Sequence, residues 1–141
     1  MNLLDQNSGW LGLPPESSWE VKNDLSDSNP FVEYRKLLWS YHLATTKGLS
    51  DQDFLTVVKN LDEAVSEIET IGFQETPLVL LSELSEAIGQ NGGVWAKNET
   101  VNVSGSHKAR HLFGLAIRLE LEEVSKNTPL TIASCGNAAL A

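Results

Sequence analysis

The sequence predicts an α/β protein with a largely parallel sheet, preceded by a helical N-terminal part. From residue 76 onward, short apolar runs of strand length alternate with helical segments, which is typical of a parallel sheet. Before residue 72, apolar residues recur at helical spacing. The chain has 141 residues, 41% hydrophobic and 21% charged, an ordinary composition for a globular domain large enough to bury a core.

Residues 1–30 are rich in Ser, Asn, Asp, Pro and Gly and predict an irregular arm. Trp10 and Trp19 are expected to anchor this arm on the body of the protein. The first residues carry no basic region before an apolar run, so they do not predict a secretory signal. No apolar run approaches the ~20 residues that a membrane span needs. With a single cysteine, Cys135, we expect a cytoplasmic protein without disulfides and without membrane contact.

Two helices are expected after the arm. Asn29 followed by Pro30 is typical of an N-cap and a first helical position, and this helix is expected to end near Gly48. Ser50 opens the second helix, with acidic residues in its first turn. The second half of that helix, residues 63–71, could instead be extended.

The second half of the chain predicts three strands and three helices. The expected strands are residues 76–81, 94–97 and 130–133, and the expected helices are residues 82–88, 106–126 and a segment that begins at 137. A loop is expected at residues 98–105. The expected buried face of the long helix consists of Leu112, Leu115, Ala116 and Leu119.

Charge and histidine spacing exclude two function classes. The chain carries 10 basic and 19 acidic residues, a net charge of −9, whereas nucleic-acid binding needs clustered Lys and Arg for phosphate contacts. His42, His107 and His111 lack the spacing of metal ligands, so we expect no metal site.

Lys108 is the first candidate functional residue, because it falls in the first turn of the long helix. The positive end of the helix dipole disfavours a cation there and favours the neutral amine that a Schiff-base lysine needs. The alternative is an ordinary solvated lysine at a helix start.

The turn Ser134–Asn137 is the second candidate, because it also follows a predicted strand and precedes a helix. Gly136 allows backbone geometry closed to other residues, and N–H groups at a helix start can bind a carboxylate or phosphate. The alternative is a plain connecting turn in which Asn137 caps the helix. Cys135 within it is expected to be a small buried residue rather than a catalytic thiol.

Together, the two turns resemble the motifs of the fold-type II pyridoxal-phosphate enzymes, the group of the tryptophan synthase β-subunit, threonine synthase, threonine dehydratase and cysteine synthase. The lysine motif of this group runs K-x-E, then N-P-T/S-G-S-x-K-x-R. The matching residues are Lys97, Glu99, Asn102, Ser104, Gly105, Ser106, Lys108 and Arg110. The S-S/T-G-N turn of the group matches Ser134–Asn137, and its T-P-L segment matches Thr76–Leu78. The resemblance covers residues 72–141.

The resemblance implies a three-layer αβα domain that starts within residues 72–141, after an N-terminal part of residues 1–71. It implies a pyridoxal 5'-phosphate cofactor and a small L-amino-acid substrate. The implied reaction is β- or γ-elimination or replacement, as in threonine synthase or threonine and serine dehydratase. A homodimer is expected for the full-length protein.

The resemblance also implies roles for individual residues. Lys108 would hold the cofactor as a Schiff base and move the α-proton of the substrate, and Asn137 would bind the phenolic oxygen of the cofactor. Ser106 would also cap the long helix. The expected substrate-binding residues are Ser106, Ser134, Cys135, Gly136 and Asn137.

The sequence departs from the family pattern at two positions. Val103 stands where proline is common, and Cys135 replaces a Ser or Thr, so that a weaker thiol donor faces the substrate carboxylate. The Gly-rich phosphate loop and the partner of the pyridine nitrogen, which follow the asparagine turn in the family, do not occur after Lys108.

The missing phosphate loop and nitrogen partner, and the helix start at residues 137–141, lead us to expect the front piece of a longer enzyme, inactive alone. The alternative is a non-catalytic interaction or regulatory module that retains half of the fold. An in-frame continuation of the gene with a Gly-rich loop would favour the enzyme.

Overall fold

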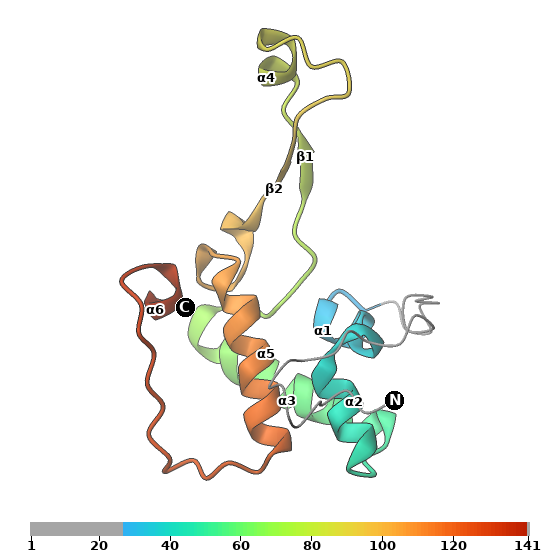
Figure 1. Ribbon diagram of the computed structural model, residues 1–141, viewed down its shortest axis with the longest axis vertical. Coiled ribbons are helices and arrows are strands. Elements are labelled where there is room, and N and C mark those ends of the chain that lie inside the picture. The colour runs from blue at the N-terminus through green and yellow to red at the C-terminus, as the bar shows by residue number, and fades with distance from the viewer. Residues whose placement is uncertain (1–26, 141) are drawn as a thin grey trace, which may run out of the picture.

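Helices form the body of the protein, and a hairpin projects from it (Figure 1). The computed structural model describes residues 27–140, so the predicted arm with Trp10 and Trp19 lies outside the described residues. The helices of the body are α1 (Pro30–Glu33), α2 (Trp39–Thr46), α3 (Asp51–Glu69) and α5 (Lys108–Leu121). The hairpin consists of β1 (Leu78–Leu80), α4 (Ser82–Ala87) and β2 (Trp95–Lys97), and α6 (Asn137–Leu140) follows the long tail.

The first helix begins as predicted but is shorter. The side chain of Asn29 accepts a hydrogen bond of 2.9 Å from the N–H of Phe31, and Pro30 is the first helical residue. The single helix predicted up to Gly48 is broken, because a 3₁₀ turn at Arg35–Leu37 separates α1 from α2. Gly48 ends the segment with a left-handed φ of +86°, which glycine adopts without strain.

The second helix, α3, confirms the predicted start at Ser50. The hydroxyl of Ser50 accepts from the N–H of Asp53, and the carboxylate of Asp53 accepts from the N–H of Ser50, a complete capping box. The extended alternative for residues 63–71 is wrong, because α3 runs unbroken to Glu69.

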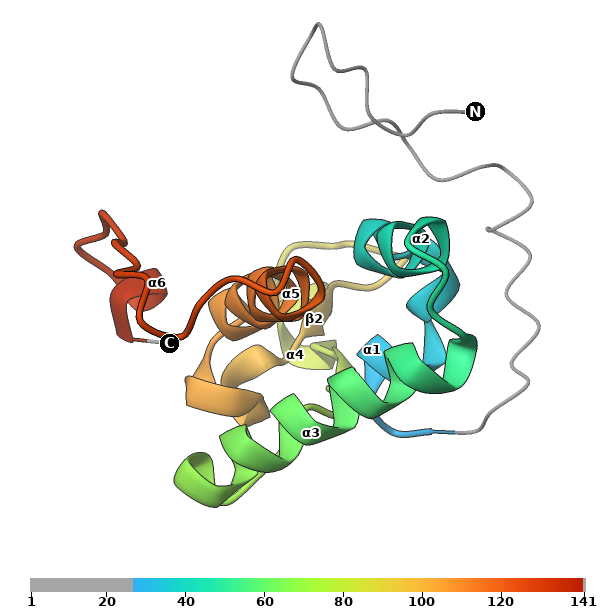
Figure 2. The ribbon, with the colours of Figure 1, turned by 90° about the horizontal axis from the view of Figure 1, so that it is seen from below.

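One hydrophobic core joins the N-terminal helices to α5. Each of α1, α2 and α5 contacts α3, and α2 also contacts α5 (Figure 2). Phe31, Phe73 and Phe113 pack against one another at its centre, with ring centroids 4.4 to 5.3 Å apart. The buried apolar residues are Phe31, Val32, Ala44, Phe54, Leu55, Val58, Phe73, Val103, Ala109, Phe113, Ile117 and Leu121.

The carboxylate of Asp62 on α3 ties two distant segments to the body. It accepts a hydrogen bond of 2.9 Å from the Asn29 side chain and one of 2.7 Å from the N–H of Phe73. A Cβ atom on Gly72 would lie 2.8 Å from the Asp62 carboxylate, so the backbone approaches this closely only because residue 72 is glycine.

The two strands pair antiparallel, so the prediction of a parallel sheet is wrong for this pair. Leu78 lies opposite Lys97, and Leu80 lies opposite Trp95. A parallel pair needs a crossover that packs on the sheet, whereas α4 has six residues and buries none of them. The turn at residues 91–93 instead reverses the chain, and the N–H of Leu81 donates to the carbonyl of Val94 at 2.8 Å.

Two further predictions for the second half differ from the structure. Residues 130–133 form no strand, because no strand lies beside them among residues 27–140 to satisfy their backbone groups. The loop predicted at residues 98–105 contains two 3₁₀ turns, Glu99–Val101 and Val103–Gly105.

The long helix α5 is shorter than predicted and buries another face. It ends at Leu121, and Glu123 follows with a left-handed φ of +54°. Its buried residues are Ala109, Phe113, Ile117 and Leu121. The face predicted to be buried, Leu112, Leu115, Ala116 and Leu119, lines an open cleft together with Leu130 and Ile132. The two faces are both apolar, so spacing alone did not distinguish them.

Replacing Phe113 by Ala is expected to lower the free energy of unfolding by about 3–5 kcal/mol, because it leaves a cavity between Phe31 and Phe73. Denaturant unfolding measures it. The control is Ile68→Ala, which removes a side chain that is 81% exposed and is expected to cost less than about 0.5 kcal/mol. Equal costs for the two variants would contradict the core described here.

Asp51 makes stability depend on pH. Hydrogen bonds from Arg35, at 2.7 and 3.0 Å, hold the pKa of Asp51 below its ordinary value of 3.8, against the opposing effect of burial. A carboxyl with a lowered folded-state pKa contributes stability above its unfolded pKa and loses it as the pH falls through the folded value. The difference in unfolding free energy between wild type and Asp51→Asn is therefore expected to be largest near pH 7 and to shrink below about pH 4. A difference independent of pH would contradict this role.

Candidate active site

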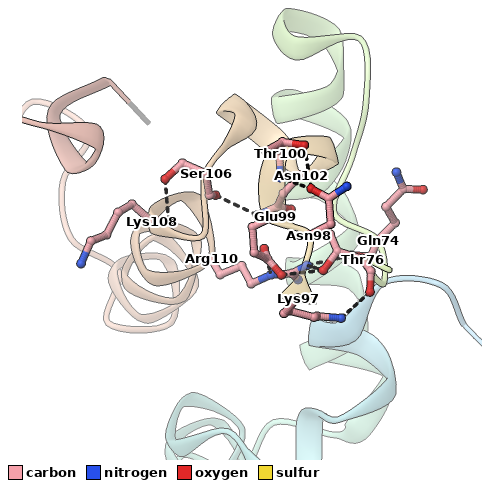
Figure 3. Close-up of polar contacts among 10 residues, drawn as sticks. All are labelled: Gln74, Thr76, Lys97, Asn98, Glu99, Thr100, Asn102, Ser106, Lys108 and Arg110. Atoms are coloured by element: carbon pink, nitrogen blue, oxygen red, sulfur yellow. Dashed lines mark hydrogen bonds and ion pairs between the residues drawn. The ribbon is translucent and has the colours of Figure 1, made fainter. Parts of the chain in front are cut away.

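Lys108 is the first residue of α5, and the loop before it determines where the helix begins. The hydroxyl of Ser106 accepts a hydrogen bond of 3.2 Å from the N–H of Lys108 (Figure 3). The Ser106 residue is buried, so its hydroxyl is fixed at the helix start. This hydrogen bond is the one that the predicted capping role of Ser106 requires, although His107 is the residue that directly precedes the helix. The contact of Ser106 with substrate stays a prediction.

The amine of Lys108 is exposed and free. Within residues 27–140 its Nζ forms no hydrogen bond and no ion pair. Its side chain points away from the polar residues that surround Arg110 (Figure 3). Because no other side chain occupies it, the amine of Lys108 is accessible to a ligand that carries a carbonyl group.

The loop that precedes Lys108 is strained and holds two unpartnered polar atoms. Ser104 and Gly105 are consecutive left-handed residues, with φ of +55° and +63°. Oδ1 of Asn102 and Oγ of Ser104 are buried without a hydrogen-bond partner in the described part of the chain. Each such group costs about 1–3 kcal/mol, and strain of this kind concentrates at functional sites. The motif included both residues, but sequence reasoning assigned them no role.

Four further motif residues form one polar cluster beside the helix start. The guanidinium of Arg110 pairs with Glu99 at 2.9 Å and donates to Thr76 Oγ1 at 3.3 Å. Thr76 Oγ1 donates to the other oxygen of Glu99 at 2.5 Å, and Lys97 Nζ donates to the Thr76 carbonyl (Figure 3). These residues were matched to the family motif one by one, and the structure brings them together.

Charge within this cluster keeps Glu99 ionised. Burial opposes ionisation, but the hydrogen bonds from Thr76 and Arg110 and the charges of Arg110 and Lys97 outweigh it and hold the pKa of Glu99 below its ordinary value. Glu99 is therefore a carboxylate near neutral pH and forms an ion pair with Arg110.

The second predicted turn, Ser134–Asn137, lies at the end of the tail and leads into α6. The N–H of Gly136 donates to Oγ of Ser134 at 3.2 Å, and the turn is exposed. Cys135 is an exposed free thiol, so the expectation that it is buried is wrong. The tail lacks the predicted strand before this turn, which leaves the thiol in solvent.

The tail brings α6 back to α5. The two helices contact each other, with α6 beside the end of α5 that carries Lys108 (Figure 1). No hydrogen bond joins Lys108 to the Ser134–Asn137 turn within the described residues. The two predicted parts of the site thus lie at neighbouring helices and are not joined by a hydrogen bond among the described residues.

The described site offers an exposed amine and an exposed turn on the adjacent helix. No group of three or more His, Cys, Asp or Glu among residues 27–140 is arranged to hold a metal ion, and no described helix is long and apolar enough to cross a membrane. An accessible amine can form a covalent bond with a carbonyl compound, and exposed N–H and hydroxyl groups can donate hydrogen bonds to a ligand.

The chain belongs to the pyridoxal-phosphate dependent enzyme family. The model of this family matches residues 70–141, half of the chain, and is consistent with the fold-type II resemblance. Enzymes of this family bind pyridoxal 5'-phosphate, and the residues present fit it, because the amine of Lys108 has no competing partner. No curated protein and no solved structure matches the chain significantly.

Replacing Ser104 by Gly is expected to raise the free energy of unfolding by about 1 kcal/mol, because it relieves both the left-handed strain and the buried hydroxyl. The matched variant Ser104→Ala relieves the hydroxyl alone and should be less stable than Ser104→Gly. Denaturant unfolding of the three proteins measures both effects. A Gly variant less stable than wild type would mean that the loop carries no strain.

Proposed function

We propose that this chain is part of a pyridoxal-phosphate-dependent lyase or transferase with Lys108 as its Schiff-base lysine. Its substrate would be a small L-amino acid, converted by β- or γ-elimination or replacement, as in threonine synthase or threonine and serine dehydratase. The observation that supports this most strongly is the free amine of Lys108 at the first turn of α5, within the part of the chain that matches the family.

The residues of this chain would divide the work as follows. Lys108 would bind the cofactor and later take the proton from Cα of the substrate at its Nζ. The bound cofactor supplies an electron sink for the negative charge left at Cα. Asn137 would hold the cofactor, and Ser106 would contact the substrate beside the helix start that it already caps.

The turn from Ser134 to Asn137 would bind the α-carboxylate of the substrate. Its exposure leaves backbone N–H groups available, and α6 begins at Asn137, where N–H groups have no partner within the helix. Cys135 supplies a thiol where the family has a hydroxyl, and a thiol is the weaker donor. We therefore expect binding of the substrate carboxylate to depend on backbone N–H groups and on Ser134.

We further propose that residues 72–141 form the beginning of a three-layer αβα domain with a parallel sheet, and that residues 1–71 form an N-terminal arm and helices that precede it. Apolar surfaces that lack cover support the first statement. They include Leu78 and Trp95 on the hairpin, which are 62% and 55% exposed, and the cleft along α5. Further strands against these surfaces would complete a sheet. The full-length enzyme would be a homodimer.

Borohydride trapping tests the proposal. The amine of Lys108 condenses with the aldehyde of added pyridoxal phosphate and releases water, and borohydride then delivers a hydride that makes the bond permanent. For the full-length gene product we expect the added mass on the peptide that contains Lys108, together with loss of the visible absorbance. Lys108→Ala is expected to abolish both.

Lys59→Ala is the matched control, because Lys59 is an exposed lysine on α3 that lies outside the motif. It is expected to label like wild type. Wild-type protein that binds no cofactor, or labels equally at many lysines, would overturn the proposal and favour a non-catalytic module. If the label is found at Lys108, release of α-keto acid from serine or threonine separates a dehydratase from a synthase.

A further inference from the structure

We propose that Glu99 and Arg110 are positioning residues for Lys108. Their ion pair clamps the first turn of α5 to the base of the hairpin and so determines the direction in which the lysine side chain projects (Figure 3). The proposal rests on the proposed function of Lys108 and adds the interactions that orient its side chain.

The first step is the placement of Arg110 on the helix. Arg110 follows Lys108 by two residues, which corresponds to a rotation of about 200° around the helix axis. The two side chains therefore leave α5 on opposite sides, as Figure 3 shows. Any rotation of the first turn that moved Lys108 would have to move Arg110 by the same angle.

The second step is what the guanidinium of Arg110 holds. It pairs with Glu99 at 2.9 Å and donates to the carbonyl of Gln74 at 3.0 Å and to the hydroxyl of Thr76 at 3.3 Å. Gln74 and Thr76 precede β1, whereas Glu99 follows β2. The planar guanidinium thus joins α5 to both strands at the base of the hairpin. A lysine at this position could not form these bonds in the same geometry.

The third step is that the clamp has a fixed base. The N–H of Phe73 donates to Asp62 on α3 at 2.7 Å, and the N–H of Glu75 donates to the carbonyl of Ser28 at 2.9 Å. Phe73 and Thr76 are buried. The segment to which Arg110 is hydrogen-bonded is thus itself fixed to the body of the protein. The bonds of Arg110 can therefore fix the orientation of α5.

The fourth step concerns burial and charge. The side chains of Glu99 and Arg110 are only 18% and 24% exposed, so loss of one partner leaves the other charge poorly solvated. By contrast, the pair Arg118–Glu122 on the same helix joins at 3.2 Å with 43% and 33% exposure. It is also an Arg–Glu pair, and Arg118 lies about two turns further from the helix start than Arg110, which makes it a matched control.

The experiment uses the full-length protein with the variants Glu99→Gln and Arg110→Lys, and Glu122→Gln as control. Hydrogen exchange of the cofactor-free protein follows the amides of residues 108–111 against those of residues 117–121. We expect roughly tenfold faster exchange at residues 108–111 in the two clamp variants, with residues 117–121 unchanged. Glu122→Gln should leave residues 108–111 as in wild type.

The second readout is the rate at which added pyridoxal phosphate forms the borohydride-trappable bond at Lys108. We expect it to fall roughly 10- to 100-fold in Glu99→Gln and Arg110→Lys, because a misdirected amine reaches the aldehyde less often. Thr76→Val removes one hydroxyl and retains the ion pair, so it gives a milder fall and serves if the other variants fold poorly.

The outcomes separate the two proposals. If wild type forms the bond and the clamp variants form it equally fast, with unchanged exchange at residues 108–111, the positioning role is wrong even where melting temperatures fall. If wild type forms no bond at Lys108, the proposed function is wrong and the positioning role falls with it. Slower bond formation in Glu122→Gln as well would also overturn the proposal, since any charge loss on α5 would then suffice.

Discussion

The packing of Phe113 against Phe31 and Phe73 is the constraint on which the rest of the structure depends. Phe31 belongs to α1, Phe73 to the segment that leaves α3, and Phe113 to the middle of α5. Their contact fixes the depth at which α5 lies on the N-terminal helices, while the polar bonds around Arg110 fix its rotation. The apolar contact is short-ranged and tolerant of rotation, and the polar one is directional, so the two together leave α5 one orientation.

Helix starts and the motif could be read from the sequence because they depend on neighbouring residues. The N-cap at Asn29, the capping box at Ser50 and the cap of Ser106 on α5 all involve partners within three residues. The family could be recognised for the same reason, since the lysine motif is a continuous stretch of residues 97–110. These features are local, and local rules were enough to predict them.

The sheet and the buried face of α5 could not be predicted because they depend on distant partners. Strand pairing requires a neighbour, and the apolar residues near Val79 pair with β2 through a reversal that local spacing does not encode. Both faces of α5 are apolar, and contact with the N-terminal helices and with Phe73 selects the side of Phe113. The cluster around Glu99 joins segments more than twenty residues apart, so the motif revealed its members but not their contact.

The exposed hairpin has a consequence for how this protein behaves in solution. The outer edges of β1 and β2 have no neighbouring strand in the described part of the chain, and Leu78, Leu80 and Trp95 are exposed on this ribbon. Bare strand edges that carry apolar side chains act as templates for intermolecular pairing. We therefore expect any form of the protein in which this ribbon stays bare, a nascent chain on the ribosome included, to be prone to aggregate.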